Sequence, residues 1–275
     1  MTAPPPDRRP VSKASLVARV VLAFSLIVPA SIIYIAICAL LVPSRYLRIL
    51  AGNVYGKLIG RNVLRSCGIR PVIENWERID RGRPALYVCN HASTADMWAG
   101  MWLCPFAGCG VAKKEVAHIP FFGQAYYLSG HLMLDRGNRE RAIASMERVK
   151  AVVDRHGLSL WMWPEGTRSR DGRLQPLKKG FVHLAIATGL PVVPVVFHDA
   201  DLLWPGRTFR ITPGDMHIEV LEPIDTSHWQ ADRVQEHADE VWSVFQGSLG
   251  PRQKALSEPS ATPSETASSS ETPQQ

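Results

Sequence analysis

The stretch VCNHASTAD, residues 88–96, determines how the rest of the sequence is interpreted. It begins at the end of a short apolar run, and such a run predicts a buried strand. Mostly small or apolar residues at 94–103 predict a helix directly beyond it, with Thr94 at the N-cap. The spacing therefore places His91 in a strand-to-helix turn and Asp96 in the first turn of the helix.

His91 and Asp96 are the candidate catalytic pair. Residues five apart do not share a face of a regular helix, so the two side chains can meet only if His91 lies in the turn and folds back. An acceptor that holds one imidazole nitrogen as N–H leaves the other nitrogen free to take a proton, which is the chemistry of a general base. By composition alone the same pair should arise in about one chain in a hundred of this size, so the prediction depends on the motifs downstream.

The composition limits the classes of partner. Lys and Arg number 31 against 25 Asp and Glu, a net charge of +6 that suits acidic partners such as anionic lipid or a phosphorylated substrate. The five cysteines include no C-x-x-C, which favours reduced, cytosol-facing thiols over a disulfide framework. No H-E-x-x-H and no Cys/His cluster at ligand spacing occurs, so we expect neither a metal site nor a cofactor. Nucleic acid is not an expected partner, because the sequence has no motif for it.

A membrane-associated segment is predicted near the N-terminus. Residues 20–42 carry no charge, and this length is enough to cross a bilayer core of about 30 Å. Pro29 lies in the middle of the run and predicts a kink or a break in the helix. Basic residues on both sides leave the orientation undecided under the positive-inside rule. The segment either bends and leaves by the leaflet that it entered, or spans the bilayer and continues into a basic juxtamembrane helix.

The remaining pattern predicts an α/β fold. Residues 44–64 predict a second, interfacial helix with Leu47, Leu50, Val54 and Leu58 on one stripe, which Arg61 can extend, and basic residues elsewhere. From residue 69 onward, short apolar runs alternate with helical patterns, which predicts a mixed sheet flanked by helices and preceded by N-terminal membrane-associated helices. The predicted parts are a disordered N-terminus at 1–12, a membrane-associated helical segment at 13–66, an α/β domain with the active site at 67–250, and a disordered tail at 251–275 that is rich in Ser, Thr, Pro and Glu.

Two further motifs follow predicted strands. Lys113 and Lys114 follow one strand and Arg136 follows the next, so these basic side chains can face the same rim of the sheet. The sequence PEGTRS at 164–169 sets a tight turn, in which Arg168 offers a guanidinium fork suited to a phosphate. Both motifs therefore predict binding of an anionic group near the carboxyl ends of the strands.

A fourth motif, GLPVVPV at 189–195, predicts a buried strand that lines either an acyl-binding groove or the core. The four motifs resemble, in order and spacing, those of the glycerolipid acyltransferase family, and the resemblance covers about residues 85–197. It implies an acyl donor, either acyl-CoA or acyl-carrier-protein, a lysophospholipid acceptor, and direct transfer without an acyl-enzyme. It also implies a pair of N-terminal membrane-associated helices. The matching motifs are N-H-x4-D at 90–96, K-x6-P-x2-G at 113–123 with D-R at 135–136, P-E-G-T-R-S at 164–169 and G-x-P-x2-P-V at 189–195.

The resemblance and the residue chemistry together imply a role for each candidate. His91 removes the proton of the acceptor hydroxyl, Asp96 orients His91, and the alkoxide attacks the thioester carbonyl. Arg168, Arg136 and one of the two lysines bind the acceptor phosphate, and Glu165 shapes that pocket. The candidate substrate-binding residues are Lys113, Lys114, Arg136, Glu165, Gly166, Thr167 and Arg168.

Several alternatives stay open at this point. The basic residues around the loop favour 1-acyl-glycerol-3-phosphate as acceptor, which gives phosphatidic acid, with glycerol 3-phosphate or another lysolipid as alternatives. An alternative of another class is a non-catalytic membrane lipid-binding protein, in which His91 is structural. A covalent hydrolase is disfavoured, because no G-x-S-x-G occurs. We expect a membrane protein with its active site facing the cytosol, whose partners are a lysophospholipid acceptor, an acyl-thioester donor and membrane lipids.

Overall fold

The computed structural model describes residues 12–79, 82–118, 122–135, 139–206 and 208–256. Within these residues a seven-stranded sheet forms the centre of the molecule, with the order β1-β7-β6-β2-β5-β3-β4. All neighbours pair in parallel except β6 and β7, so the sheet is mixed, as the sequence predicts. The strands are β1 (Ile69–Glu74), β2 (Leu86–Cys89), β3 (Gly108–Lys113), β4 (Leu132–Leu134), β5 (Ser159–Met162), β6 (Val192–His198) and β7 (Gly214–Val220).

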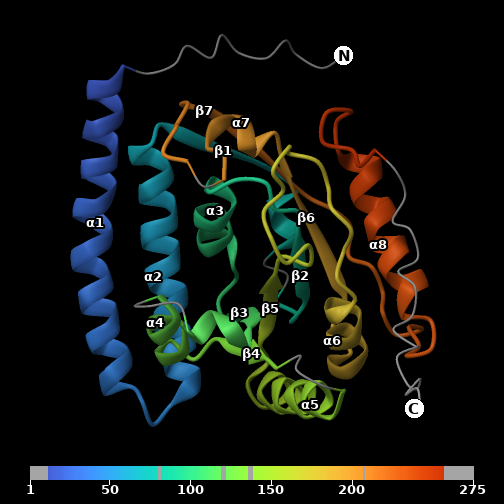
Figure 1. The fold of residues 1–275 in the computed structure, drawn as a ribbon. Coiled ribbons are helices and arrows are strands. Elements are labelled where there is room, and N and C mark those ends of the chain that lie inside the picture. The colour runs from blue at the N-terminus through green and yellow to red at the C-terminus, as the bar shows by residue number, and fades with distance from the viewer. Residues whose placement is uncertain (1–11, 80–81, 119–121, 136–138, 207, 257–275) are drawn as a thin grey trace, which may run out of the picture.

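Helices cover both faces of the sheet (Figure 1). One apolar core joins the sheet to α2, α3 and α7, and a second core joins it to α5, α6 and α8. The α/β fold with flanking helices is therefore confirmed. The helices are α1 (Lys13–Leu40), α2 (Arg45–Ser66), α3 (Ala95–Leu103), α4 (Phe122–Leu128), α5 (Arg139–His156), α6 (Gly180–Thr188), α7 (Ala200–Leu203) and α8 (Val234–Ser248), with short 3-10 helices at η1 (Trp76–Arg78) and η2 (Lys114–His118).

The central strand β2 lies between these two cores. All four of its residues are buried, and they alternate between the two cores. Leu86 and Val88 face α5, α6 and α8, whereas Tyr87 and Cys89 face α2 and α3. A parallel strand that is covered on both faces has a continuous apolar sequence, and this is the pattern that predicted β2.

The N-terminal helix α1 runs without a break through Pro29. Proline in a helix interior removes one backbone hydrogen bond and costs about 3 kcal/mol, which is why the sequence predicts a kink or a break. Packing along α2 supports the helix on both sides of this position. The Ser31 and Tyr55 hydroxyls lie 2.7 Å apart, and the Arg19 guanidinium donates to the carbonyl oxygen of Ser66 at 3.2 Å. The predicted break therefore does not occur.

The second helix, α2, has a buried side and an exposed side. Its buried side packs closely on α3, because a Cβ at Gly56 would lie 2.8 Å from the carbonyl oxygen of Met101. At Gly60 a Cβ would clash with the carbonyl oxygen of Trp98. On the opposite side, three residues of the predicted apolar stripe are exposed by 45% to 58%, namely Leu47, Val54 and Leu58, whereas Leu50 is half-buried.

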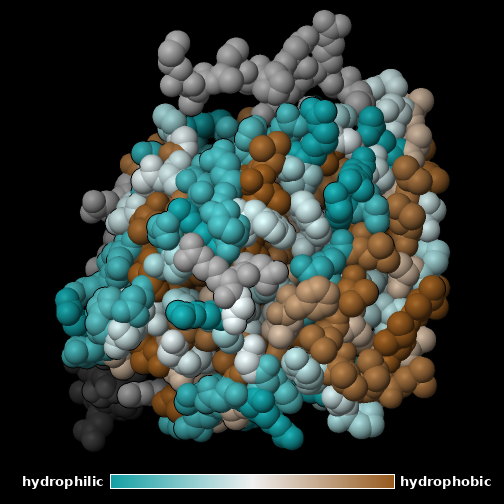
Figure 2. Space-filling model, turned by 180° about the vertical axis from the view of Figure 1, so that it is seen from behind, coloured by the Kyte–Doolittle hydropathy of each residue, from teal (hydrophilic) through white to brown (hydrophobic). Residues whose placement is uncertain are grey.

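The exposed side of α2 adjoins a larger apolar surface on α1. Among the described residues one helix is long and apolar enough to cross a membrane, namely α1 over Val17–Leu40. Figure 2 shows apolar side chains gathered at the edge of the molecule that α1 and α2 form. Exposed apolar surface of this extent marks a site of membrane or protein contact. The large exposed apolar residues of α1 are Val17, Val21, Leu22, Phe24, Leu26, Val28, Ile32, Ile33, Ile35, Ile37 and Leu40.

The edge strand β1 is an element that the sequence did not single out. It pairs with β7 and ends the sheet on that side. Ile69 is its one buried residue, so β1 lacks the apolar run that identified the central strands. Pro71 is tolerated in it, because an edge strand leaves one row of N–H groups unpaired.

Candidate active site

Asn90 fixes the turn that follows β2. Its buried amide extends the pairing between β2 and β6: Nδ2 donates to the carbonyl oxygen of Phe197 at 3.0 Å, and Oδ1 accepts from the Phe197 N–H at 2.8 Å. A side chain that satisfies backbone groups in this way lets the main chain leave the sheet without unpaired polar groups. His91 therefore lies between β2 and α3, in the turn.

Asp96 is fully buried and faces back into that turn. Its Oδ2 lies 3.2 Å from His91 Nδ1 and also accepts from the backbone N–H groups of Ala92 at 2.8 Å and Ser93 at 2.7 Å. An ionised carboxylate only accepts hydrogen bonds, so Nδ1 of His91 carries the proton. The described residues offer no hydrogen-bond partner to Nε2, which is left free to take a proton.

The ring of His91 packs on a second side chain and is still partly exposed to solvent. The indole of Trp163 packs on it with a centroid distance of 5.0 Å and an interplanar angle of 31°. The His91 side chain is 14% exposed, whereas Asp96 is 0% exposed. The pair therefore has one buried member that orients and one accessible member that can react.

The start of α3 differs from the prediction in one detail. Thr94 occupies the N-cap position, but its side chain makes no capping hydrogen bond. Ser93 serves instead: its Oγ accepts from the Ala95 N–H at 2.9 Å and donates to the carbonyl oxygen of Trp204 at 2.7 Å. The Thr94 N–H donates to the same carbonyl at 3.0 Å. The hydroxyl of Thr94 is thereby available to other side chains.

Glu165 connects the loop after β5 to the turn at residues 90–94, which we call the catalytic turn because it carries the candidate base His91. It is buried, and its Oε1 accepts from the backbone N–H of His91 at 2.6 Å while Oε2 accepts from that of Gln175 at 3.2 Å. Burial raises the pKa of Glu165 to about 8, although the two N–H donors oppose the shift. The Ser169 N–H also donates to the carbonyl oxygen of His91 at 2.8 Å. Glu165 thus ties the loop to the turn through its backbone contacts.

Arg168 lies within the same loop, and few hydrogen bonds from the described residues hold its side chain. Its one hydrogen bond in the part of the chain that the structure describes is a long contact of 3.5 Å from Nη1 to the Thr94 hydroxyl. Gly166, with φ of 74°, makes the turn just before it, and Thr167 is exposed. A half-buried guanidinium with unused donors next to the catalytic turn can bind an anion.

The second motif is described only in part. Lys114 is 57% exposed on its side chain and pairs with Asp135 at 3.0 Å. Lys113 ends β3, while Arg136 lies outside the described residues. Since β2, β3, β4 and β5 are parallel, their carboxyl ends, and the motifs that follow them, share one edge of the sheet.

The fourth motif belongs to the core. Gly189 ends α6 in the left-handed conformation, with φ of 67°, and β6 follows. Val192 and Val196 join one apolar core, and Val193 and Val195 join the other. Of the two predicted alternatives, these residues fit the core.

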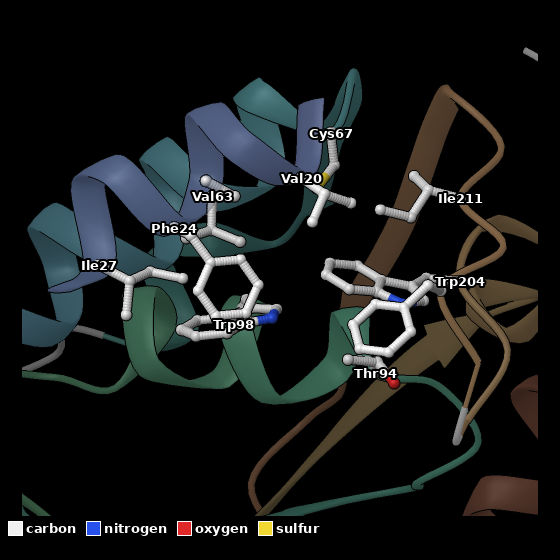
Figure 3. Close-up of a pocket in the computed structure, with 11 residues that line it drawn as sticks. Val20, Phe24, Ile27, Val63, Cys67, Thr94, Trp98, Trp204 and Ile211 are labelled. Atoms are coloured by element: carbon white, nitrogen blue, oxygen red, sulfur yellow. The ribbon is translucent and has the colours of Figure 1, made fainter. Parts of the chain in front are cut away.

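An apolar pocket of about 170 Å³ lies beside the catalytic turn (Figure 3). This is close to the size of a ~150 Å³ dry cavity that can bind benzene. Thr94 lines the pocket and also contacts Arg168, so the pocket adjoins the candidate anion site. The sequence motifs did not indicate the residues of the 204–211 segment, which lie far along the chain. The lining residues are Val20, Ala23, Phe24, Ile27, Val63, Cys67, Thr94, Trp98, Trp204, Phe209 and Ile211.

These features define a class of protein. The buried carboxylate of Asp96 leaves His91 with a free Nε2 that can act as a base, and Arg168 can bind an anion within the same site. The neighbouring pocket is apolar and is formed in part by α1, the helix that can enter a membrane. This arrangement suits an enzyme that moves a proton on an amphiphilic, anionic substrate at a membrane surface.

Comparison with known proteins identifies the family. A family model described as Acyltransferase matches residues 70–198, which include all four motifs. The 1-acyl-sn-glycerol-3-phosphate acyltransferase of Limnanthes douglasii is 40% identical over 238 residues, which is 86% of this chain and 84% of the relative. That of Escherichia coli (strain K12) is 36% identical over 174 residues, 63% of this chain and 70% of the relative. The chain therefore belongs to this acyltransferase family, and it is an enzyme.

A solved structure shares the fold. The crystal structure of the 1-acyl-sn-glycerophosphate (LPA) acyltransferase, PlsC, from Thermotoga maritima is similar with a TM-score of 0.64. The similarity covers 83% of this chain and 91% of that chain, at 24% sequence identity. The mixed sheet with flanking helices is thus a fold that a known acyltransferase also adopts.

Proposed function

We propose that this acyltransferase moves a fatty acyl group from an acyl thioester to the free hydroxyl of 1-acyl-glycerol-3-phosphate, which gives phosphatidic acid. The observation that carries the proposal is the orientation of His91 by the buried Asp96 beside the sparsely bonded guanidinium of Arg168. The relatives with 35% to 40% identity in the comparison carry the name of this activity, which supports the choice of acceptor. Acyl-CoA and acyl-carrier-protein both remain candidates for the donor.

In this mechanism His91 is the general base. Nε2 takes the proton of the acceptor hydroxyl, and the hydroxyl oxygen attacks the thioester carbonyl as the O–H bond breaks. The C–S bond of the tetrahedral intermediate then breaks, and the thiolate leaves with the proton returned from His91. General base catalysis of this kind contributes about 10²–10⁴-fold, and positioning of the two substrates supplies much of the rest. The reaction transfers the acyl group without a covalent enzyme intermediate.

Arg168 is the proposed ligand of the acceptor phosphate. A guanidinium can donate two parallel hydrogen bonds to a phosphate, and among the described residues few of the Arg168 donors are used. Arg136 and one of Lys113 and Lys114 are proposed to add positive charge at the same edge of the sheet. Lys114 already pairs with Asp135, so it would exchange that partner for the phosphate.

We further propose that α1 and α2 contact the membrane together, as a hairpin whose exposed apolar sides enter the lipid while the inner side of α2 stays packed on α3, so that the active site stays on the cytosolic side. Arg19 near the start of α1 contacts Ser66 at the end of α2, so both ends of the hairpin lie together. Both helices expose apolar side chains on their outer sides. The two ends of the hairpin can therefore lie on the same side of the membrane, as in the predicted bent segment, although the chain reverses between α1 and α2 and not at Pro29. Protease should then cut both flanks of the hairpin from the cytosolic side, whereas cleavage of one flank from each side would contradict the hairpin.

An assay with purified full-length protein in detergent tests the activity. Wild-type protein is mixed with a panel of lysolipids and glycerol 3-phosphate, with acyl-CoA and acyl-carrier-protein as separate donors, and products are identified by mass. The proposal predicts phosphatidic acid from 1-acyl-glycerol-3-phosphate as the main product. A preference for another acceptor contradicts the substrate assignment. Release of no thiol with any acceptor contradicts the catalytic function and favours a lipid-binding protein.

A further inference from the structure

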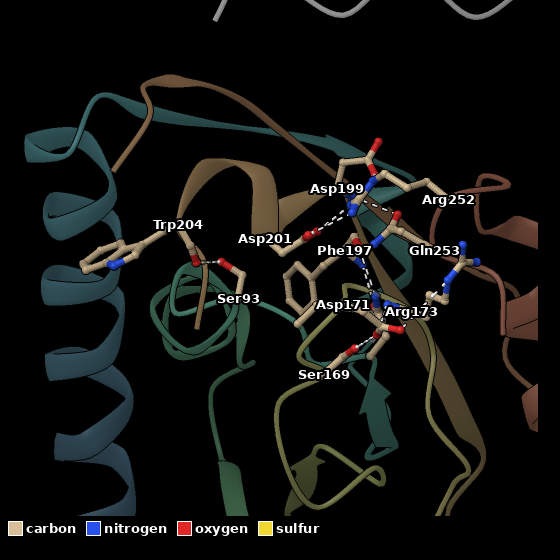
Figure 4. A network of polar contacts seen from close by, with 12 residues as sticks. Ser93, Ser169, Asp171, Arg173, Phe197, Asp199, Asp201, Trp204, Arg252 and Gln253 are labelled. Atoms are coloured by element: carbon tan, nitrogen blue, oxygen red, sulfur yellow. Dashed lines mark hydrogen bonds and ion pairs between the residues drawn. The ribbon is translucent and has the colours of Figure 1, made fainter. Parts of the chain in front are cut away.

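The chain after α8 returns to the carboxyl end of β6, on the side of the sheet where His91 lies (Figure 4). We define residues 249–255 as the C-terminal strap. A turn forms there, in which the N–H groups of Gln253 and Lys254 donate to the carbonyl oxygen of Gly250 at 2.9 and 3.1 Å. Gln253 is 1% exposed, which is unusual for an amide in a segment after the last helix. The strap is therefore part of the folded domain.

Gln253 joins the strap to the end of β6. Its Oε1 accepts from the Asp199 N–H at 2.9 Å, and its Nε2 donates to the carbonyl oxygen of Phe197 at 3.1 Å. The same Phe197 oxygen accepts from Nδ2 of Asn90, the residue before His91. Gln253 of the strap and Asn90 of the catalytic turn therefore both donate to the carbonyl oxygen of Phe197.

Arg252 joins the strap to the start of α7. Its guanidinium donates to Asp201 at 2.9 Å from Nη1 and 2.6 Å from Nη2, and to Asp199 at 2.9 Å from Nε. Asp199 has φ of 49°, a left-handed conformation that is costly for a non-glycine residue. The other end of this one-turn helix leads to Trp204, whose carbonyl oxygen binds the start of α3. Arg252 therefore holds one end of a short element whose other end supports the catalytic turn.

The strap also holds the exit of the Arg168 loop. The Leu174 N–H donates to the carbonyl oxygen of Gln253 at 2.8 Å, and Arg173 Nη1 donates to that of Lys254 at 2.8 Å. At Gly172 a Cβ would lie 2.7 Å from Nη1 of Arg252, so the loop backbone packs directly on this guanidinium. These three consecutive loop residues all contact the strap.

Arg168 is connected to both elements that Arg252 holds. Its own loop contacts the strap from Gly172 onward, four residues after Arg168. The segment after α7 also lies close to it, since a Cβ at Gly206 would lie 3.2 Å from Cδ of Arg168. A shift of either element would move the guanidinium of Arg168 relative to His91.

We propose that Arg252 is a positioning residue for acyl transfer, which sets the place of the Arg168 guanidinium relative to His91. The inference rests on the proposed function, in which Arg168 binds the acceptor phosphate. Arg252 itself touches no substrate and acts through Asp199, Asp201 and the loop at Gly172. A merely stabilising ion-pair network would change the folded fraction and would lower every activity of the enzyme by the same factor.

Two rates measured on the same full-length sample separate these roles. One is transfer to 1-acyl-glycerol-3-phosphate, and the other is hydrolysis of the donor thioester without acceptor, which needs His91 and no phosphate site. Arg252→Ala should raise the KM for the acceptor about 10- to 100-fold, because a misplacement of about 1 Å can cost this much. The hydrolysis rate per folded protein should fall by a much smaller factor than transfer, because His91 and Asp96 keep their own hydrogen bond. Arg252→Lys keeps the charge but lacks the guanidinium fork, so it should give a smaller rise in the acceptor KM. If the alanine variant does not fold, the same two rates are compared for the lysine variant.

A control and a double variant sharpen the test. Arg233→Ala removes another arginine–carboxylate pair, in which Nε of Arg233, just before α8, lies 3.0 Å from the exposed Glu236 carboxylate in the first turn of α8. This variant should leave the acceptor KM unchanged. If Arg252 acts through Arg168, the variant with both Arg252→Ala and Arg168→Lys should have an acceptor KM within about twofold of Arg168→Lys alone.

Three results would overturn the positioning role: an unchanged acceptor KM in Arg252→Ala, equal losses in transfer and hydrolysis, or KM effects that multiply in the double variant. Failure of the proposed function is a separate result. It would appear as a wild-type protein that does not acylate 1-acyl-glycerol-3-phosphate. An active wild-type enzyme with an indifferent Arg252→Ala variant contradicts the positioning role alone.

Discussion

The variant Asp96→Asn separates the charge of Asp96 from its hydrogen bonds. Oδ2 accepts from His91 Nδ1, from the Ala92 N–H and from the Ser93 N–H, whereas Oδ1 has no hydrogen-bond partner among the described residues. An asparagine can place its carbonyl oxygen at the Oδ2 position and its amide at the Oδ1 position. It then keeps the three hydrogen bonds and the Nδ1–H tautomer. The variant loses the negative charge that faces the imidazolium formed during proton transfer.

The expected loss of rate follows from the 3.2 Å between His91 Nδ1 and Asp96 Oδ2. At an effective dielectric constant of about 20, opposite unit charges at this separation attract by about 5 kcal/mol. A tenfold change in rate corresponds to about 1.4 kcal/mol, and the asparagine dipole retains part of the attraction, so kcat should fall by about 10²–10⁴-fold. The KM for the acceptor should change little, because Asp96 is fully buried.

The assay is thiol release from the donor thioester in the presence of 1-acyl-glycerol-3-phosphate, with the thermal unfolding midpoint as the control for folding. Asp96→Ala removes the charge and the hydrogen bonds together, so it should lose at least as much activity and also stability. If Asp96→Asn stays folded and keeps kcat within about tenfold of wild type, His91 does not become charged beside Asp96. The general-base mechanism would then be refuted.

Three further predictions address the loop, the buried acid and the N-terminal helices. Arg168→Lys keeps the charge but loses the fork, so kcat/KM for acceptors with a terminal phosphate should fall about 10- to 150-fold; an equal loss in acceptor-free donor hydrolysis would contradict the phosphate assignment. The pKa of Glu165 is raised by burial from its ordinary 4.5 to about 8, so the wild-type protein should lose stability as the pH rises through this window. In the Glu165→Gln variant the thermal unfolding midpoint should depend less on pH over this window. A midpoint that falls with pH as steeply as in the wild type would contradict the raised pKa of Glu165. Gly60→Ala should destabilise by about 1–3 kcal/mol, because its Cβ would clash with the carbonyl oxygen of Trp98, while the control Gly247→Ala meets nothing within 4 Å. Similar unfolding midpoints for these two alanine variants would show that α2 does not depend on this close approach.

Much of the fold could be predicted, because burial on both faces of the sheet leaves a local record in the sequence. The apolar runs of β2, β5 and β6 arise from this burial, and they correctly located the central strands. The turn that holds His91 also followed from local spacing, since Asn90 lies where β2 ends and Asp96 lies where α3 begins.

Features that depend on contacts between distant parts of the chain could not be predicted. Trp204 supports the catalytic turn through its carbonyl oxygen, an atom that every residue type carries, so no sequence signal marks it. Arg252 and Gln253 follow the last helix in a stretch whose polar composition predicted disorder, yet both contact residues at or just after the carboxyl end of β6. The break predicted at Pro29 does not occur, because α1 packs on α2 on both sides of the proline, and this packing leaves no local pattern in the sequence.

The most direct measurement is the rate of acyl transfer by His91→Ala compared with wild type, in the same detergent and with the same thioester donor and 1-acyl-glycerol-3-phosphate. The variant should remain folded and membrane-bound, because the His91 side chain contributes a single contact to the buried Asp96, whose two backbone donors remain. Loss of the general base should lower transfer by at least about 10²–10⁴-fold. A folded His91→Ala protein that transfers acyl groups at close to the wild-type rate would contradict the assignment of His91 as the base.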